Sequence, residues 1–155
     1  MPRWRRRSRW RAWSGRPHSI HTVLVLVGDV HRGVVRAVQY ARTLAGPDVS
    51  IRAVLIETDP AQTLRVEAKW TAWSLGVPLV VLSSPYRSLL RPLLDYVDQI
   101  QARGDQEMIT IVLPEFLPRK WWQHALHNQT ALLIKGALLF RRNLIVADVP
   151  YLLPR

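Results

Sequence analysis

The side chains that could do chemistry in this sequence gather just after its short apolar runs. Four such runs are followed by polar segments, at residues 28–33, 57–59, 83–87 and 114–120. An arginine beside a helix N-terminus can grip a phosphate, while backbone N–H groups of the helix supply further donors. The segments therefore predict a binding site for a ligand with polar and anionic parts, such as a nucleotide. The candidate nucleotide-binding residues are Asp29, His31, Arg32, Tyr86, Arg87 and Glu115.

These candidates also have plainer roles, which the sequence leaves open. His31 can cap the helix that follows it, and Arg87 can form an ion pair with a neighbouring acid. Across the four polar segments, four acids balance four bases. This balance argues against a specific nucleic-acid surface, because such a surface is strongly basic on one face. An ion-paired interface between subunits fits the same balance.

A second dense polar group follows the fourth apolar run. It consists of Arg119, Lys120, Trp121, Trp122, His124, His127, Asn128 and Gln129. The tryptophan pair can stack on a base or anchor a helix to its neighbour. His124 and His127 share a helix face and could hold a metal together with Glu115. Two histidines without a third placed ligand more often pack or form hydrogen bonds, so we expect neither a metal nor a cofactor.

Catalytic signatures are missing from the sequence. Gly28 and Gly33 lack the spacing of a dinucleotide fingerprint, and no Gly-Lys-Ser/Thr motif follows them to cradle phosphates. No Gly-x-Ser-x-Gly nucleophile elbow is present. The chain contains no cysteine, which excludes thiolate nucleophiles and disulfides. We therefore expect a non-catalytic protein.

Five apolar segments of strand length must position these residues. They are residues 22–27, 49–56, 79–82, 108–113 and 144–147, and helical patterns separate them at residues 31–45, 60–72, 88–103 and 120–141. In the second helix, the stripe of Ala61, Leu64, Ala68 and Ala72 is expected to face the core. Apolar strands alternating with helices predict an α/β fold, a Rossmann-like, doubly wound, five-stranded parallel sheet. Ligands of such sheets bind outside the carboxyl ends of the strands.

The basic character of the chain is concentrated at its start. Residues 1–17 hold seven arginines, three tryptophans and no acid, out of a net charge of +11. We expect residues 1–20 to be a disordered tail and residues 21–155 to form one domain. Arginine and tryptophan together can bind anionic lipid headgroups or nucleic acid, although a solvated tail without a role fits equally. The apolar run of residues 131–140 is about half the length of a membrane span, and Lys135 interrupts it.

Three segments carry a resemblance to a known family. They are HRGVVRAVQYARTL, SSPYRSLLRPLLDYVD and LPEFLPRKWWQHALHNQTALLIKGALLFRRNLIVADVPY. Over about residues 21–153 the chain resembles the cytoplasmic C-terminal domain of bacterial permeases of the amino acid–polyamine–organocation superfamily, the KimA-type potassium importer group. The resemblance implies a universal-stress-protein-like domain that follows a membrane-embedded permease portion.

The resemblance also implies partners and a place in the cell. A domain of this kind forms a homodimer, binds cyclic di-AMP and regulates an amino acid or potassium permease from the cytoplasmic side of the cell membrane. The glycine-rich loop of ATP-binding universal stress proteins is replaced here by residues 114–122, which contain no glycine. This favours a cyclic dinucleotide over ATP. A purely structural dimerisation module and an adenine-nucleotide hydrolase are the alternatives.

Overall fold

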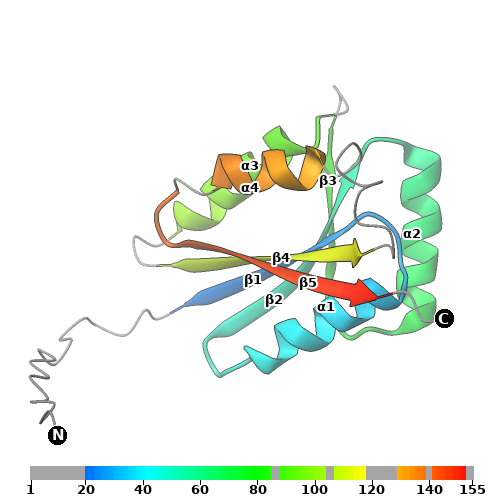
Figure 1. Cartoon of the computed structure of the whole chain (residues 1–155), viewed down its shortest axis with the longest axis horizontal. Coiled ribbons are helices and arrows are strands. Elements are labelled where there is room, and N and C mark those ends of the chain that lie inside the picture. The colour runs from blue at the N-terminus through cyan, green and yellow to red at the C-terminus, as the bar shows by residue number, and fades with distance from the viewer. Residues whose placement is uncertain (1–19, 85–87, 104–106, 118–128, 139–140, 153–155) are drawn as a thin grey trace, which may run out of the picture.

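The computed structural model describes residues 20–84, 88–103, 107–117, 129–138 and 141–152, and it alternates strands with helices (Figure 1). The elements are β1 (His21–Val27), α1 (Arg32–Thr43), β2 (Val49–Glu57), α2 (Pro60–Trp73), β3 (Leu79–Ser83), α3 (Leu90–Gln101), β4 (Met108–Leu117), α4 (Gln129–Leu138) and β5 (Leu144–Leu152). The basic tail that the sequence predicts over residues 1–20 lies outside the described residues, except for Ile20.

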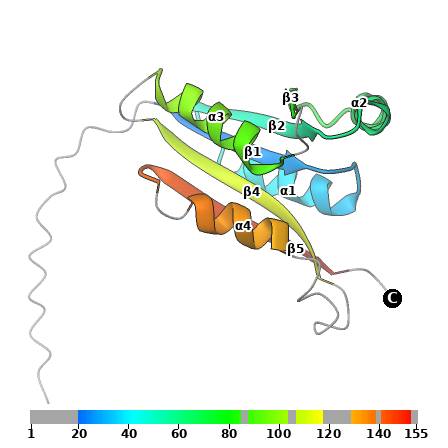
Figure 2. The same cartoon turned by 90° about the horizontal axis from the view of Figure 1, so that it is seen from above.

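The five strands form one parallel sheet in the order β3-β2-β1-β4-β5. Successive side chains of a strand point to opposite faces, so Val23 and Val25 of β1 pack with α1 and α2, whereas Leu24 packs with α3 and α4. Figures 1 and 2 show α1 on one side of the sheet and α3 and α4 on the other. The predicted Rossmann-like α/β fold is therefore confirmed.

The first helix buries the face that its sequence predicts. Val34, Val38 and Ala41 are almost inaccessible to solvent, and they recur at the spacing of one helix face. The sequence predicts helix over residues 31–45, but α1 ends at Thr43 and Ala45 is exposed. The helix therefore ends two residues earlier than predicted.

The predicted core face of α2 is wrong. Ala61, Ala68 and Ala72 are exposed, and Leu64 is 68% exposed. The buried residues of this helix are Thr63, Val66 and Trp70, and the Trp70 indole donates a hydrogen bond of 3.0 Å to the Val77 carbonyl. A tryptophan buries about 150–250 Å², more than any single residue of the predicted stripe, so Trp70 together with Val66 determines which side of α2 faces inward.

The last two strands are longer than predicted. The sequence predicts that they end at Leu113 and Ala147, but β4 continues to Leu117 and β5 to Leu152, with Pro114 opposite Val149 and Glu115 opposite Pro150. The pairing of β1 with β4 ends at Val112. Beyond that point β4 and β5 form a two-stranded extension at the carboxyl edge of the sheet.

The fourth helix is described only in part. The sequence predicts helix over residues 120–141, and the structure has α4 at Gln129–Leu138, where Ile134 and Leu138 are buried. Residues 118–128 lie outside the described residues. The polar group from Arg119 to Asn128 therefore stays a prediction.

Candidate functional site

The order of the strands places a topological switch point between β1 and β4. These strands are neighbours, yet α1 follows β1 on one face of the sheet and α4 follows β4 on the other. Ligands of open α/β sheets bind at such a switch point, outside the carboxyl ends of the strands. The loop between β1 and α1, residues 28–31, lies at this edge and holds two of the predicted site residues, Asp29 and His31.

His31 is the N-cap of α1, which is the simpler of the roles that the sequence leaves open for it. Its Nδ1 accepts a hydrogen bond of 3.3 Å from the Val34 backbone N–H, which satisfies one free donor of the first turn. A neutral imidazole accepts at one nitrogen and donates at the other. The proton of neutral His31 therefore belongs on Nε2.

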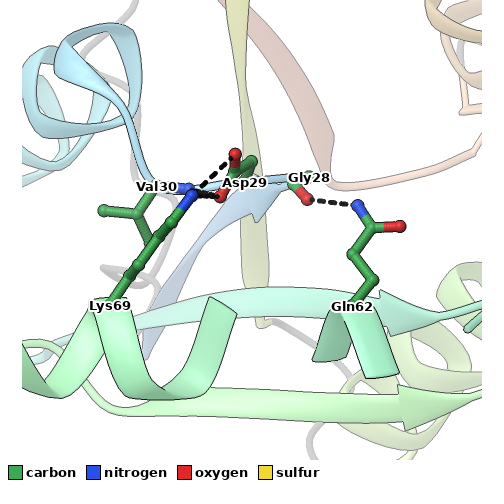
Figure 3. Close-up of polar contacts among 5 residues, drawn as sticks. All are labelled: Gly28, Asp29, Val30, Gln62 and Lys69. Carbon is green, nitrogen blue, oxygen red and sulfur yellow. Dashed lines mark hydrogen bonds and ion pairs between the residues drawn. The ribbon is translucent and has the colours of Figure 1, made fainter. Parts of the chain in front are cut away.

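Asp29 is held by α2 (Figure 3). The Lys69 ammonium lies 2.8 Å from Oδ1 and 3.1 Å from Oδ2 of Asp29, and the Val30 N–H donates to Oδ1 at 2.7 Å. Two turns earlier on α2, Gln62 donates at 3.4 Å to the Gly28 carbonyl. Sequence reasoning missed Lys69 and Gln62, because their partners are distant along the chain. Their spacing of seven residues on one helix was the only available signal.

Gly33 lets the first turn of α1 approach the end of β5. A Cβ atom at this position would lie 3.0 Å from the His31 ring and 3.4 Å from the Tyr151 Cβ. A larger side chain would push the helix away from the two-stranded extension. Arg32, the third predicted site residue in this region, is exposed at the start of α1. The structure thus brings Asp29, His31 and Arg32 together with Lys69 and Tyr151.

The surroundings of these groups move their pKa values. Burial lowers the pKa of His31 below 6.5; the charge of Asp29 opposes this effect and that of Lys69 reinforces it. Burial likewise lowers the pKa of His21, at the start of β1. The hydrogen bond from Lys69 lowers the pKa of Asp29 below 3.8, with partial burial acting in the opposite direction. At neutral pH the site therefore carries a neutral His31 and an ion-paired carboxylate, and His21, at the opposite edge of the sheet, is neutral as well.

Acid should destabilise the domain through the histidines. The unfolded chain protonates them as the pH falls through 6.5, whereas the folded chain does so only at a lower pH. Their contribution to stability is complete above 6.5 and is lost as the pH falls further. The Asp29 contribution is lost in a separate window, below 3.8.

Thermal unfolding between about pH 7.5 and pH 5 tests this expectation. The melting temperature of the wild type should fall with pH, and that of His31→Asn should fall less, because asparagine caps a helix without titrating near neutrality. His21→Gln provides the same comparison at the other histidine. An unchanged slope in both variants would contradict the assignment of these histidines.

The remaining predicted site residues are placed less completely. Tyr86 and Arg87 lie outside the described residues. The flanks of their segment are tied together, because the buried Ser84 hydroxyl donates at 2.7 Å to the Ser88 carbonyl. Glu115 lies in β4, beyond the last pair with β1. In the sequence Tyr86 and Arg87 follow β3, whereas Glu115 lies within β4 and not after its end, contrary to the sequence prediction.

A second polar cluster lies at the opposite edge of the sheet, and the sequence analysis did not anticipate it. The Thr22 hydroxyl donates at 2.6 Å to Oε1 of Glu107, and both residues are buried. On the other face of the sheet, Nε2 of His21 lies 2.8 Å from the Thr110 hydroxyl. These contacts join the starts of β1 and β4, so they belong to the scaffold rather than to the candidate site at the carboxyl edge.

Metal-binding clusters and membrane-spanning helices can be assessed only in the described part of the chain. Among those residues, no group of three or more His, Cys, Asp or Glu side chains could hold a metal ion. In the same ranges, none of the helices has the length and apolar character needed to cross a bilayer.

Comparison with known proteins identifies the family. Residues 19–151 match the model of the KimA potassium transporter C-terminal domain. The chain is also 32% identical over 131 residues to the potassium transporter KimA of Bacillus subtilis, an alignment that covers 83% of this chain and 21% of that protein. The chain thus spans about a fifth of the length of this curated relative. With the match over nearly the whole α/β domain, the chain belongs to the family of KimA potassium transporter C-terminal domains.

Proposed function

We propose that this chain is a non-catalytic regulatory domain of a potassium transporter, located at the cytoplasmic face of the cell membrane. The single observation that carries the proposal is the family match over residues 19–151. The carboxyl edge of the sheet is polar, and the sequence lacks a nucleophile motif. Both features agree with the proposal. The transport activity itself would reside in a membrane-embedded portion, which binds or precedes this domain.

The proposed ligand is a cyclic dinucleotide such as cyclic di-AMP, bound at the carboxyl edge. Arg32 is exposed beside the free N–H groups of the α1 N-terminus, and Arg87 follows β3 at the same edge. Both can neutralise phosphate charge, while Tyr86 can stack on a base. Asp29, His31 and Glu115 complete the proposed set as hydrogen-bonding groups. The absence of glycine from residues 114–122 favours side chains over flexible backbone as the means of holding the ligand.

Calorimetric titration tests the ligand. Cyclic di-AMP should release or absorb heat and saturate, whereas ATP should bind more weakly. Arg87→Ala should weaken the binding of cyclic di-AMP about tenfold, because a charge-assisted hydrogen bond to phosphate is lost. The control is Arg91→Ala, an exposed arginine of α3. No heat with either nucleotide from micromolar to millimolar concentration would refute the sensing role, and equal effects of the two variants would refute the role of Arg87.

A homodimer is the proposed assembly. β5 is an edge strand of the sheet, and its Ile145 side chain is 44% exposed. An edge strand presents unpaired backbone groups that a second chain can cover. Cyclic di-AMP has two equivalent halves, so a symmetric dimer can offer each half the same residues.

The exposed edge also favours the second candidate function, a purely structural dimerisation module. This module would associate without any nucleotide. Light scattering distinguishes the alternatives when it is combined with calorimetry. A dimer that ignores cyclic di-AMP supports the structural module, whereas a monomer at high concentration contradicts both proposals.

A further inference from the structure

The solvent face of α1 carries charge of one sign only. Arg32, Arg36, Gln39 and Thr43 are exposed, while the opposite side of the helix is buried against the sheet. The sequence of α1 contains three arginines and no acid. In the part of the chain that the structure describes, the ion pairs involve neither Arg32 nor Arg36. This face is therefore a stripe of positive charge that no described acid neutralises.

The other helices differ from α1 in this respect. On α2, exposed Lys69 forms an ion pair with Asp29, and on α3 exposed Arg91 and Asp95 lie one turn apart. In α4, Lys135 lies 2.8 Å from Asp148 of β5. Among the described parts of the helices, two exposed arginines on one face without an acid in the same helix or an ion pair are thus found on α1.

The basic tail joins the domain next to the end of α1. The backbone N–H of His21, at the start of β1, donates at 2.9 Å to the carbonyl of Asp48, in the short connection from α1 to β2. Figure 1 shows the start of β1 and the end of α1 on the same side of the molecule. Residues 1–17 add seven arginines and three tryptophans without an acid. The chain before Ile20 is therefore attached on the side of the domain where α1 ends.

We propose that the α1 face, Arg32–Arg36–Gln39–Thr43, docks on anionic lipid headgroups. Clustered arginines attract anionic lipids, and tryptophan favours the membrane interface. Tyr40 lies beside the stripe and is 38% exposed. It adds an amphipathic side chain to this face. The choice of a membrane as the partner rests on the proposed role in a transporter. The charge complementarity between the α1 face and anionic lipids does not depend on nucleotide binding.

Vesicle co-sedimentation of the full chain tests the proposal. Vesicles of phosphatidylcholine with phosphatidylglycerol should bind the chain, vesicles of phosphatidylcholine alone should not, and added salt should weaken binding. Arg36→Gln should weaken binding about fivefold and Arg36→Glu about 25-fold, since each basic residue near the surface contributes about that factor. Arg36 is not among the proposed nucleotide-binding residues.

Two controls make the result decisive. Arg91→Glu changes the charge equally on α3, on the opposite face of the sheet, and should reduce binding far less than Arg36→Glu. Replacement of Arg5, Arg6 and Arg7 by serine measures the share of the tail. Equal loss in the two glutamate variants, or loss only in the tail variant, would overturn the role of α1. Tighter binding to an RNA oligonucleotide than to anionic vesicles would overturn the choice of partner. Vesicle binding without response to cyclic di-AMP would support this proposal while the nucleotide proposal fails.

Discussion

Replacing Trp70 with alanine should lower the free energy of unfolding by about 3–5 kcal/mol. The Trp70 side chain is only 7% exposed and packs with Val66 and Val77 under α2. Its indole N–H donates to the Val77 carbonyl. The substitution removes most of the apolar contact of α2 with the sheet and leaves the Val77 carbonyl without this donor. Urea unfolding followed by far-ultraviolet circular dichroism measures the change without relying on tryptophan fluorescence.

Trp73 provides the matched control in the same helix. It is 44% exposed, so Trp73→Ala should lower the free energy of unfolding by about 1 kcal/mol, clearly less than Trp70→Ala. Comparable losses in the two variants would mean that α2 does not pack through Trp70. They would also restore the face predicted from Ala61, Leu64, Ala68 and Ala72.

Replacing Thr22 with valine should lower the free energy of unfolding by about 2–3 kcal/mol. Valine keeps the shape of threonine but removes the hydroxyl that donates to Glu107. The Glu107 carboxyl group is then buried without that donor, and buried polar groups that lose their partner destabilise a fold more than an average hydrogen bond stabilises it. Urea denaturation at about pH 7.5 measures the loss.

A double variant separates this cause from a packing defect. Thr22→Val combined with Glu107→Met removes both polar partners and should recover most of the stability, because two apolar groups in place of a buried pair are close to neutral. Thr71→Val, at an exposed position of α2, should have little effect. A double variant as unstable as Thr22→Val alone would indicate that the valine itself packs badly.

The positions of the strands along the chain were largely predictable from apolar runs. Residues 22–27, 49–56 and 79–82 agree with β1, β2 and β3 to within one residue at each end. Side chains of a doubly covered sheet are apolar on both faces, so these runs are continuous and conspicuous. In β4 and β5, by contrast, the runs contain Pro114 and Pro150. Proline usually marks the end or edge of a strand, and the predicted strands end before these prolines, at Leu113 and Ala147. In the structure, β4 and β5 pair with each other beyond those residues, so both strands are longer.

The inward side of α2 was not predictable from spacing alone. Ala61, Leu64, Ala68 and Ala72 have helical periodicity, and so do Thr63, Val66 and Trp70. The choice depends on which stripe fills the space above β2 and β3, a property of the tertiary structure. The size of Trp70 was the usable signal.

For the candidate site, the sequence predicted local features better than distant ones. His31 as a cap and the carboxyl-edge location of Asp29 and Arg32 depend on neighbouring residues and on the parallel sheet. The Lys69 partner of Asp29 depends on how α2 crosses the sheet, which no local pattern encodes.

The central strand of the sheet is the first strand of the chain, and this order bears on how the protein is made. Of the five strands, β1 leaves the ribosome first and can pair with β2 soon afterwards. Its other neighbour, β4, is distant in sequence, as the pairing of His21 with Met108 shows. Until β4 has been synthesised, one side of β1 has no native partner. Parallel contacts between residues so distant in sequence slow folding. We therefore expect the arrival of β4, rather than helix formation, to limit the rate at which nascent chains become native, with an exposed apolar strand available to chaperones in the interval.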